Sequence, residues 1–245
     1  MRLQAVLFDL GETLVRREPA DRDELERRMS AALHAALAAR VPALPPPAAL
    51  HARISALTAA HAPVHTRQAL LGHLVAATGW PIDPEDPEII SAWQVPLLAA
   101  GQVEPDLAET LARLRALDLR LGVLSNTTWR RAWRDRELDR EGLLDLFPVR
   151  VYSADLAIAK PDPRIFAAAL AALGDIPPEA TLYVGDDLRA DISGAHEAGL
   201  WAAWLPPAGA APPPTSGPAH PALVLGALRE LPGALAGRWG LPEAP

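Results

Sequence analysis

The chain of 245 residues contains no cysteine and few aromatic residues, which make up 5% of it. Without thiols the protein cannot form disulfides, use a thiolate nucleophile or bind zinc through cysteine. Its apolar runs are short or interrupted, whereas a membrane-spanning helix needs roughly 20 apolar residues. A formal net charge of -7 argues against a broad nucleic-acid-binding surface, because such a surface must be basic. We therefore expect a soluble, cytoplasmic protein without nucleic-acid or membrane partners.

Lysine is almost absent as well: Lys160 is the single lysine beside 22 arginines. In a chain with this bias, a position that needed only positive charge would readily become arginine. An ammonium is a compact point charge that fits beside a phosphate and a carboxylate, where a guanidinium is too large. Two prolines, Pro161 and Pro163, restrict the backbone directly after the lysine. The sequence therefore favours a specific electrostatic role for Lys160.

Apolar segments of strand length alternate with helical patterns over most of the chain. Buried strands are predicted at residues 3–10, 120–125, 149–153, 181–185 and 200–205, with a weaker one at 222–225. Helices are predicted at residues 106–117, 162–173 and 190–198. Such alternation is typical of an α/β fold, so we predict a Rossmann-like parallel sheet with helices on both faces.

The alternation stops between about residues 18 and 100, where only helical patterns occur. Four helices are predicted there, at residues 21–40, 48–61, 66–78 and 87–99, separated by proline-rich joints. We predict an α/β core made of residues 1–17 and 101–245, with an inserted all-helical cap domain of residues 18–100. Near the other end, the proline-rich segment 206–221 is expected to be an extended loop, and the chain beyond Leu235 to be frayed.

Polar residues gather where the predicted strands end. They are Asp9 after the first strand, Ser125 and Asn126 after the second, and Asp186, Asp187 and Asp191 after the segment 181–185. In an open parallel sheet, ligands bind outside the carboxyl ends of the strands, so these residues should converge. Clustered carboxylates repel one another, and a divalent cation with oxygen ligands would offset that repulsion. Each segment alone is also compatible with an ordinary turn or helix cap.

Taken together, the segments FDLGETL, VLSN, AKPDPRIF and VGDDLRAD resemble, in this order, the four motifs of the haloacid dehalogenase superfamily of hydrolases. The resemblance runs from Leu3 to about Leu235. The helical insertion is similar to the cap that the family places between its first two motifs. The resemblance implies a phosphatase-like hydrolase that acts on a small phosphorylated metabolite with Mg²⁺ as cofactor.

The resemblance also implies a role for each matching catalytic residue. Asp9 would attack phosphorus and form an aspartyl-phosphate. Ser125, together with backbone N–H groups near Asn126, would bind the phosphoryl oxygens. Lys160 would neutralise charge on Asp9 and on the transferring group. Phosphoryl transfer mainly requires positioning and charge neutralisation, and these residue types supply both.

The implied metal site combines three carboxylates with one backbone carbonyl. Mg²⁺ would bind Asp9, the carbonyl oxygen of Gly11, and Asp186. Asp191 would support the metal, with Asp187 as the less favoured choice.

The match with the family breaks at Gly11, where its phosphatases usually carry a second Asp that protonates the leaving oxygen. Such general acid–base help is typically worth about 10²–10⁴-fold in rate. Two interpretations keep a phosphatase: the leaving group needs little protonation, as in a sugar-1-phosphate or an acyl phosphate, or Glu12 replaces the missing acid. A 2-haloacid dehalogenase is a further alternative, and so is a catalytically weak protein that binds a phosphorylated ligand.

Overall fold

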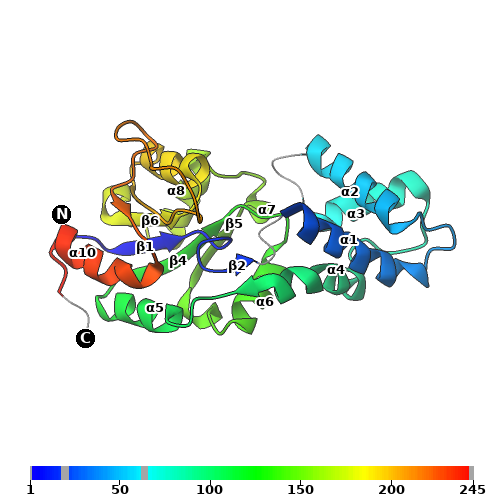
Figure 1. Ribbon diagram of the computed structural model, residues 1–245, viewed down its shortest axis with the longest axis horizontal. Helices are drawn as coiled ribbons and strands as arrows, with labels where there is room; N and C mark the ends of the chain where they lie inside the picture. Colours follow the sequence, from blue (N-terminus) through cyan, green and yellow to red (C-terminus); the bar gives the residue numbers. More distant parts are fainter. Residues whose placement is uncertain (1, 18–21, 62–65, 243–245) are drawn as a thin grey trace.

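The computed structural model describes residues 2–17, 22–61 and 66–242. Figure 1 shows an elongated molecule with a β-sheet and its helices at one end and a group of further helices at the other. Among the described helices, none is both long enough and apolar enough to cross a membrane.

Six strands of the described chain form one sheet in the order β5-β4-β1-β6-β7-β8, and every neighbouring pair is parallel. The strands are β1 (Ala5–Phe8), β4 (Arg120–Ser125), β5 (Val149–Tyr152), β6 (Thr181–Gly185), β7 (Trp201–Trp204) and β8 (Leu223–Val224). Each lies within a segment predicted as a strand. The residues of β1 and β6 are buried throughout, as expected for central strands covered on both faces. The prediction of an α/β fold with a parallel sheet is confirmed.

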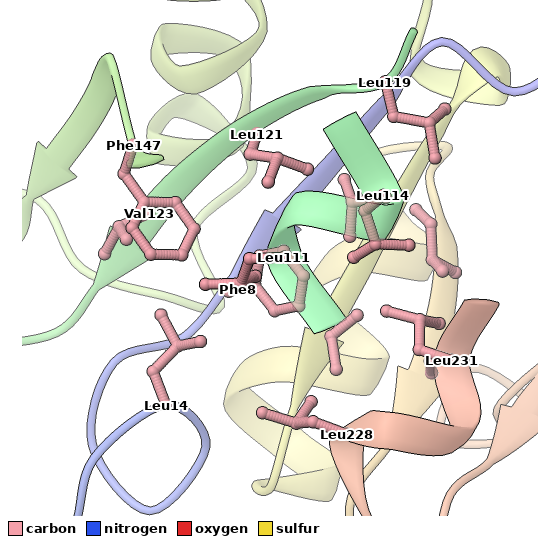
Figure 2. Close-up of a cluster of buried hydrophobic side chains, with 14 of the residues drawn as sticks. Phe8, Leu14, Leu111, Leu114, Leu119, Leu121, Val123, Phe147, Leu228 and Leu231 are labelled. Atoms are coloured by element: carbon pink, nitrogen blue, oxygen red, sulfur yellow. The ribbon is translucent and has the colours of Figure 1, made fainter. Parts of the chain in front are cut away.

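Helices cover both faces of the sheet. Successive side chains of β1 point to opposite faces, so each face contributes to a separate hydrophobic cluster. Val6 and Phe8 face a cluster that includes leucines of α5 (Leu107–Ala116) and α10 (Leu231–Trp239) (Figure 2). Ala5 and Leu7 face a second cluster. That cluster is completed by side chains of α8 (Pro163–Ala172) and α9 (Gly194–Glu197).

Shorter elements connect these layers. They are α7 (Ser153–Leu156), η1 (Leu144–Leu146), η2 (Pro178–Ala180), η3 (Leu188–Ser193) and η4 (Leu228–Glu230). In place of the single helix predicted at residues 190–198, the structure has two consecutive segments, the π-helical η3 and then α9. It begins earlier than predicted because the side chain of Asp187 accepts hydrogen bonds from the N–H groups of Arg189 and Ala190.

The four helices of the insertion form a hydrophobic cluster of their own. They are α1 (Arg22–Ala38), α2 (Pro47–His61), α3 (Arg67–Thr78) and α4 (Pro87–Ala100). The chain enters and leaves them through an antiparallel ribbon of β2 (Arg16–Arg17) and β3 (Gly101–Gln102). The first predicted domain boundary falls beside residues 18–21, which lie outside the described residues. The division into an α/β core and a helical cap domain stays a prediction.

Two helices differ from the sequence-based expectations. The helix α6 (Arg131–Arg140) was not predicted, because its sequence RAWRDRELDR has no apolar stripe. The expectation of fraying beyond Leu235 is wrong for residues 236–239, since α10 continues to Trp239, and residues 243–245 lie outside the described chain. The rings of Trp239 and Trp201 pack edge to face with centroids 5.7 Å apart, and Leu241 is buried. Those contacts join residues far apart in the sequence, so the local sequence pattern does not predict them.

Candidate active site

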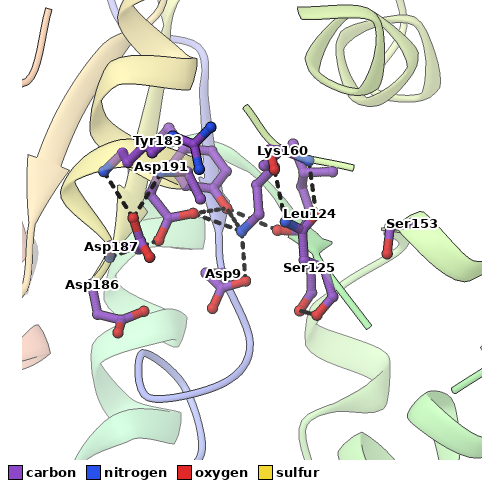
Figure 3. Close-up of polar contacts among 12 residues, drawn as sticks. Asp9, Leu124, Ser125, Ser153, Lys160, Tyr183, Asp186, Asp187 and Asp191 are labelled. Atoms are coloured by element: carbon purple, nitrogen blue, oxygen red, sulfur yellow. Dashed lines mark hydrogen bonds and ion pairs between the residues drawn. The ribbon is translucent and has the colours of Figure 1, made fainter. Parts of the chain in front are cut away.

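The predicted site residues converge at the carboxyl edge of the sheet. Asp9 follows β1, Ser125 ends β4 and Asp186 follows β6. Because β1 lies between β4 and β6, these three chain segments are neighbours. The backbone N–H of Asp9 donates to the carbonyl of Val184 at 2.9 Å, which ties the two carboxylate-bearing strand ends together. Figure 3 shows the side chains gathered around the ammonium of Lys160.

Lys160 is the hub of the site and is buried, with 6% of its surface exposed. Its Nζ donates to Asp9 Oδ1 at 2.7 Å, to Asp191 Oδ1 at 2.7 Å and to the hydroxyl of Tyr183 at 2.6 Å. Burial alone would lower the pKa of Lys160, but the charges of Asp191 and Asp9 more than compensate and hold it above its ordinary value. The side chain is therefore an ammonium saturated with acceptors.

Three carboxylates compete for this one ammonium. Oxygens of Asp9, Asp186 and Asp191 lie within 4.8 Å of one another. Burial, followed by repulsion from Asp9 and Asp191, raises the pKa of Asp186 to about 7. The donor set consists of hard oxygen atoms with an excess of negative charge, which fits a divalent cation such as Mg²⁺.

Asp191 and Asp187 have different surroundings. Asp191 is buried, and its Oδ2 accepts the N–H of Asp187 at 3.0 Å. A Cβ at Gly185 would lie 2.3 Å from the same oxygen, so only glycine leaves room for this carboxylate. Asp187 instead caps η3 through its side chain and does not belong to the carboxylate cluster of the described residues.

The raised pKa of Asp186 predicts pH-dependent metal binding. We expect the affinity for Mg²⁺ or Mn²⁺ to increase as the pH rises through about 7, because the metal binds the ionised carboxylate and a proton competes with it below that pKa. Each pH unit below the pKa should weaken binding by up to about tenfold. Isothermal titration calorimetry without substrate measures this. Asp139 is exposed, so Asp139→Asn is the control and should bind the metal with the same pH dependence as the parent protein. A metal affinity of the parent protein that does not change with pH would contradict the prediction.

The loop after Asp9 turns back on itself at Gly11 and Glu12. The N–H of Glu12 donates to the carbonyl of Val15, and the N–H of Val15 donates to the carbonyl of Leu10, both at 2.9 Å. These hydrogen bonds use the carbonyls of Leu10 and Val15, and not that of Gly11. Glu12 is exposed and has a positive φ of 61°. Its carboxylate lies 3.7 Å from the guanidinium of Arg17.

Ser125 and Asn126 play visibly different parts. Ser125 is buried, and its hydroxyl makes a weak hydrogen bond to the carbonyl of Asn126 at 3.5 Å. The Asn126 side chain is occupied twice by the backbone of Lys160: its Nδ2 donates to the Lys160 carbonyl at 2.9 Å, and its Oδ1 accepts the Lys160 N–H at 2.8 Å. Asn126 therefore positions the lysine, a role that sequence reasoning missed.

Sequence reasoning also missed Tyr183. Its hydroxyl accepts from Lys160 and donates to the carbonyl of Leu124 at 2.8 Å, which links β6 to β4. The available signal was the tyrosine hydroxyl in the middle of the buried strand TLYVG, because a buried polar group needs a partner.

Comparison with known proteins decides the family. The family model described as haloacid dehalogenase-like hydrolase matches residues 3–199, about four-fifths of the chain. The chain belongs to this family. The matched segment contains every residue of the site described above, from Asp9 to Asp191.

Curated relatives of this haloacid dehalogenase-like hydrolase include phosphatases. A glyceraldehyde 3-phosphate phosphatase of Methanopyrus kandleri is 38% identical over 96 residues, which cover 39% of this chain and 40% of that protein. A phosphoserine phosphatase of Thermus thermophilus is 37% identical over 106 residues, covering 41% and 39%. The chain thus spans about two-fifths of the length of these relatives.

Solved structures extend the similarity over the whole fold. The crystal structure of a 2-haloacid dehalogenase from Pseudomonas syringae matches with a TM-score of 0.71 and 29% identity, covering 96% of this chain and 99% of that one. The haloacid dehalogenase-like hydrolase therefore shares an overall fold with a dehalogenase and short regions of sequence with phosphatases.

Proposed function

We propose that this hydrolase is a Mg²⁺-dependent phosphatase that acts on a small phosphorylated metabolite through an aspartyl-phosphate on Asp9. The observation that carries the proposal is the carboxylate cluster around Lys160. One buried ammonium bridges Asp9 and Asp191 at 2.7 Å each, and Asp186 adds a third carboxylate. Phosphoryl transfer depends on positioning and charge neutralisation, and this cluster is suited to both.

In the first step, a carboxylate oxygen of Asp9 attacks phosphorus, and the leaving group departs with the electron pair of the broken P–O bond. Lys160 fixes the orientation of Asp9 through Oδ1 and offsets the charge of the transferring group. The Ser125 hydroxyl, free of a strong partner among the described residues, is placed to donate to a phosphoryl oxygen. In the second step, water attacks phosphorus and releases phosphate and the Asp9 carboxylate.

Asp9, Asp186 and Asp191, with the carbonyl of Gly11, are the residues that we propose to hold Mg²⁺. The ion would supply positive charge to the phosphoryl oxygens. The helices α1–α4 are proposed as a cap that excludes water and selects the substrate.

The test is a phosphatase assay on an aryl phosphate and a panel of phosphorylated metabolites, with Mg²⁺ and with EDTA. We expect phosphate release that requires Mg²⁺ and is abolished by the chelator. A folded protein that is inactive across the panel would overturn the proposal, and the panel would otherwise begin to identify the substrate.

The 2-haloacid dehalogenase of similar structure provides a second candidate function. Dehalogenation of this kind uses an aspartyl ester without a metal, so it would leave the carboxylate cluster without a cation other than Lys160. For that reason the phosphatase is favoured. Chloride release from 2-chloropropionate in the presence of EDTA, together with no phosphate release, would reverse that choice.

A further inference from the structure

A network of arginines and glutamates lies beside the loop that follows Asp9. Arg17, in β2, has 10% of its side chain exposed, and its Nη2 donates to Glu137 Oε1 at 2.7 Å. The other oxygen of Glu137 accepts from Arg134 at 2.5 Å. Arg134 and Glu137 are both buried. Two guanidiniums therefore share one buried carboxylate, and the other carboxylate near Arg17, that of Glu12, is exposed and 3.7 Å away.

The guanidinium of Arg17 occupies the space of a missing side chain. A Cβ at Gly11 would lie 2.9 Å from Arg17 Nη1. Gly11 is two residues after Asp9, so this cation borders the nucleophile's own loop. A side chain at position 11 would have to displace the guanidinium or pair with it.

Arg17 is anchored at one nitrogen and has donors to spare at the others. Its Nη1 has only long contacts, 3.5 Å to the carbonyl of Val15 and 3.7 Å to Glu12 Oε1. Its Nε is buried and has no hydrogen-bond partner among the described residues. Uncommitted donors of a buried cation call for an acceptor, preferably an anionic one.

We propose that Arg17 is a catalytic residue that stabilises the negative charge developing on the leaving-group oxygen. This inference rests on the proposed phosphatase function and names its substrate class: phosphoryl compounds whose leaving group is a stable anion, such as acyl, enol or aryl phosphates. The P–O bond breaks with its electron pair going to the leaving oxygen. No proton is transferred in that step, and the anion leaves beside Arg17 and takes its proton from water afterwards.

The test compares kcat/KM for dinitrophenyl, nitrophenyl and phenyl phosphate, because kcat/KM includes departure of the leaving group. The parent protein should lose activity steeply along this series as the leaving group becomes more basic. Arg17→Met should lower kcat/KM for phenyl phosphate by about 10²-fold, a typical effect of removing one charge-stabilising donor. The loss for dinitrophenyl phosphate should be much smaller, and Arg17→Lys should fall between.

The neighbouring arginine is the matched control. Arg16, in the same strand, is exposed and pairs with Glu104 at 3.0 Å. Arg16→Met should therefore leave the whole series unchanged. In Arg17→Met, Glu137 keeps its partner Arg134, so the variant should fold, and the charge-retaining Arg17→Lys tests the same point if it does not.

Three results would overturn the inference. An equal loss on all three esters would indicate a structural role for Arg17. Equal activity of the parent protein on all three would show that leaving-group charge does not matter. If the parent protein hydrolyses none of them with Mg²⁺, the proposed function itself fails, and that result is distinct from the other two.

A rescue experiment places an acidic side chain in the space beside Gly11 that the Arg17 guanidinium occupies. In Gly11→Asp the new carboxyl group lies against Arg17, which should keep it ionised and useless as an acid. In the double variant Gly11→Asp with Arg17→Met, the new carboxyl group no longer has the Arg17 guanidinium beside it and can act as an acid. We expect the double variant to regain activity on phenyl phosphate relative to Arg17→Met alone. No such gain, in folded protein, would argue against leaving-group stabilisation at this position.

Discussion

Asp9→Asn should abolish phosphate release while the protein stays folded. The change removes the proposed nucleophile and keeps the shape of the side chain, so we expect a loss on the order of 10⁴-fold or more in kcat. Lys160 keeps Asp191 and Tyr183 as partners. The repulsion that raises the pKa of Asp186 also decreases when Asp9 is neutral. The melting temperature should therefore be unchanged or slightly higher, as is common when a charged site is neutralised.

The measurement combines a phosphatase assay with thermal unfolding, and Asp139→Asn on the exposed side of α6 is the matched control. That control should keep full activity, because Asp139 lies outside the carboxylate cluster. Activity of Asp9→Asn near that of the parent protein would rule out the aspartyl-phosphate mechanism.

Lys160→Arg should cost most of the activity although it keeps the positive charge. The ammonium fits three acceptors at 2.6 to 2.7 Å in a buried space, whereas a guanidinium is larger and planar. We expect kcat to fall by about 10²–10³-fold, since charge stabilisation at the reacting group depends on donor placement. Lys160→Met should destabilise the fold as well, by about 3–5 kcal/mol, because it leaves buried carboxylates without their cation.

The reciprocal change is the control for the arginine variant. Arg164, at the start of α8, is exposed and pairs with Asp162, so Arg164→Lys should alter neither activity nor stability measurably. Steady-state kinetics and urea unfolding separate the two effects in Lys160→Arg. A mild effect on kcat in a stable variant would return Lys160 to the role of an ordinary loop residue.

Much of the fold could be predicted from the sequence, because parallel strands that are buried on both faces are continuous apolar runs. The central strands β1 and β6 were found for that reason, whereas the edge strand β8 is not buried and gave only a weak pattern. The four helices of the insertion were found from periodicity and from the prolines that separate them. The helix α6 was missed for the opposite reason. Its buried side chains include Arg134 and Glu137, which pair with each other, and Glu137 also pairs with Arg17. These charged residues make the sequence look like a solvent-exposed segment.

The part of the candidate site whose residues stand at the ends of strands could also be predicted. Asp9, Ser125 and Asp186 stand at strand ends, and the rule that parallel strands place their carboxyl ends together predicts their meeting. Lys160 was singled out by rarity. Of the three acceptors around its ammonium, Asp9 was expected from the family resemblance. Tyr183 and Asp191 were not expected there, because they reach the lysine from another part of the chain.

By itself, the sequence determined the α/β alternation, the position of the helical insertion and the residues that meet at the sheet edge, because these depend on local patterns of polarity along the chain. Only the tertiary structure decided how charges are shared: that Lys160 serves Asp9 and Asp191 together, that Asn126 holds the lysine backbone, and that Arg17 lies over Gly11. Such contacts join residues far apart in sequence, and their energies depend on burial and on distances of a few ångströms, which no linear pattern encodes.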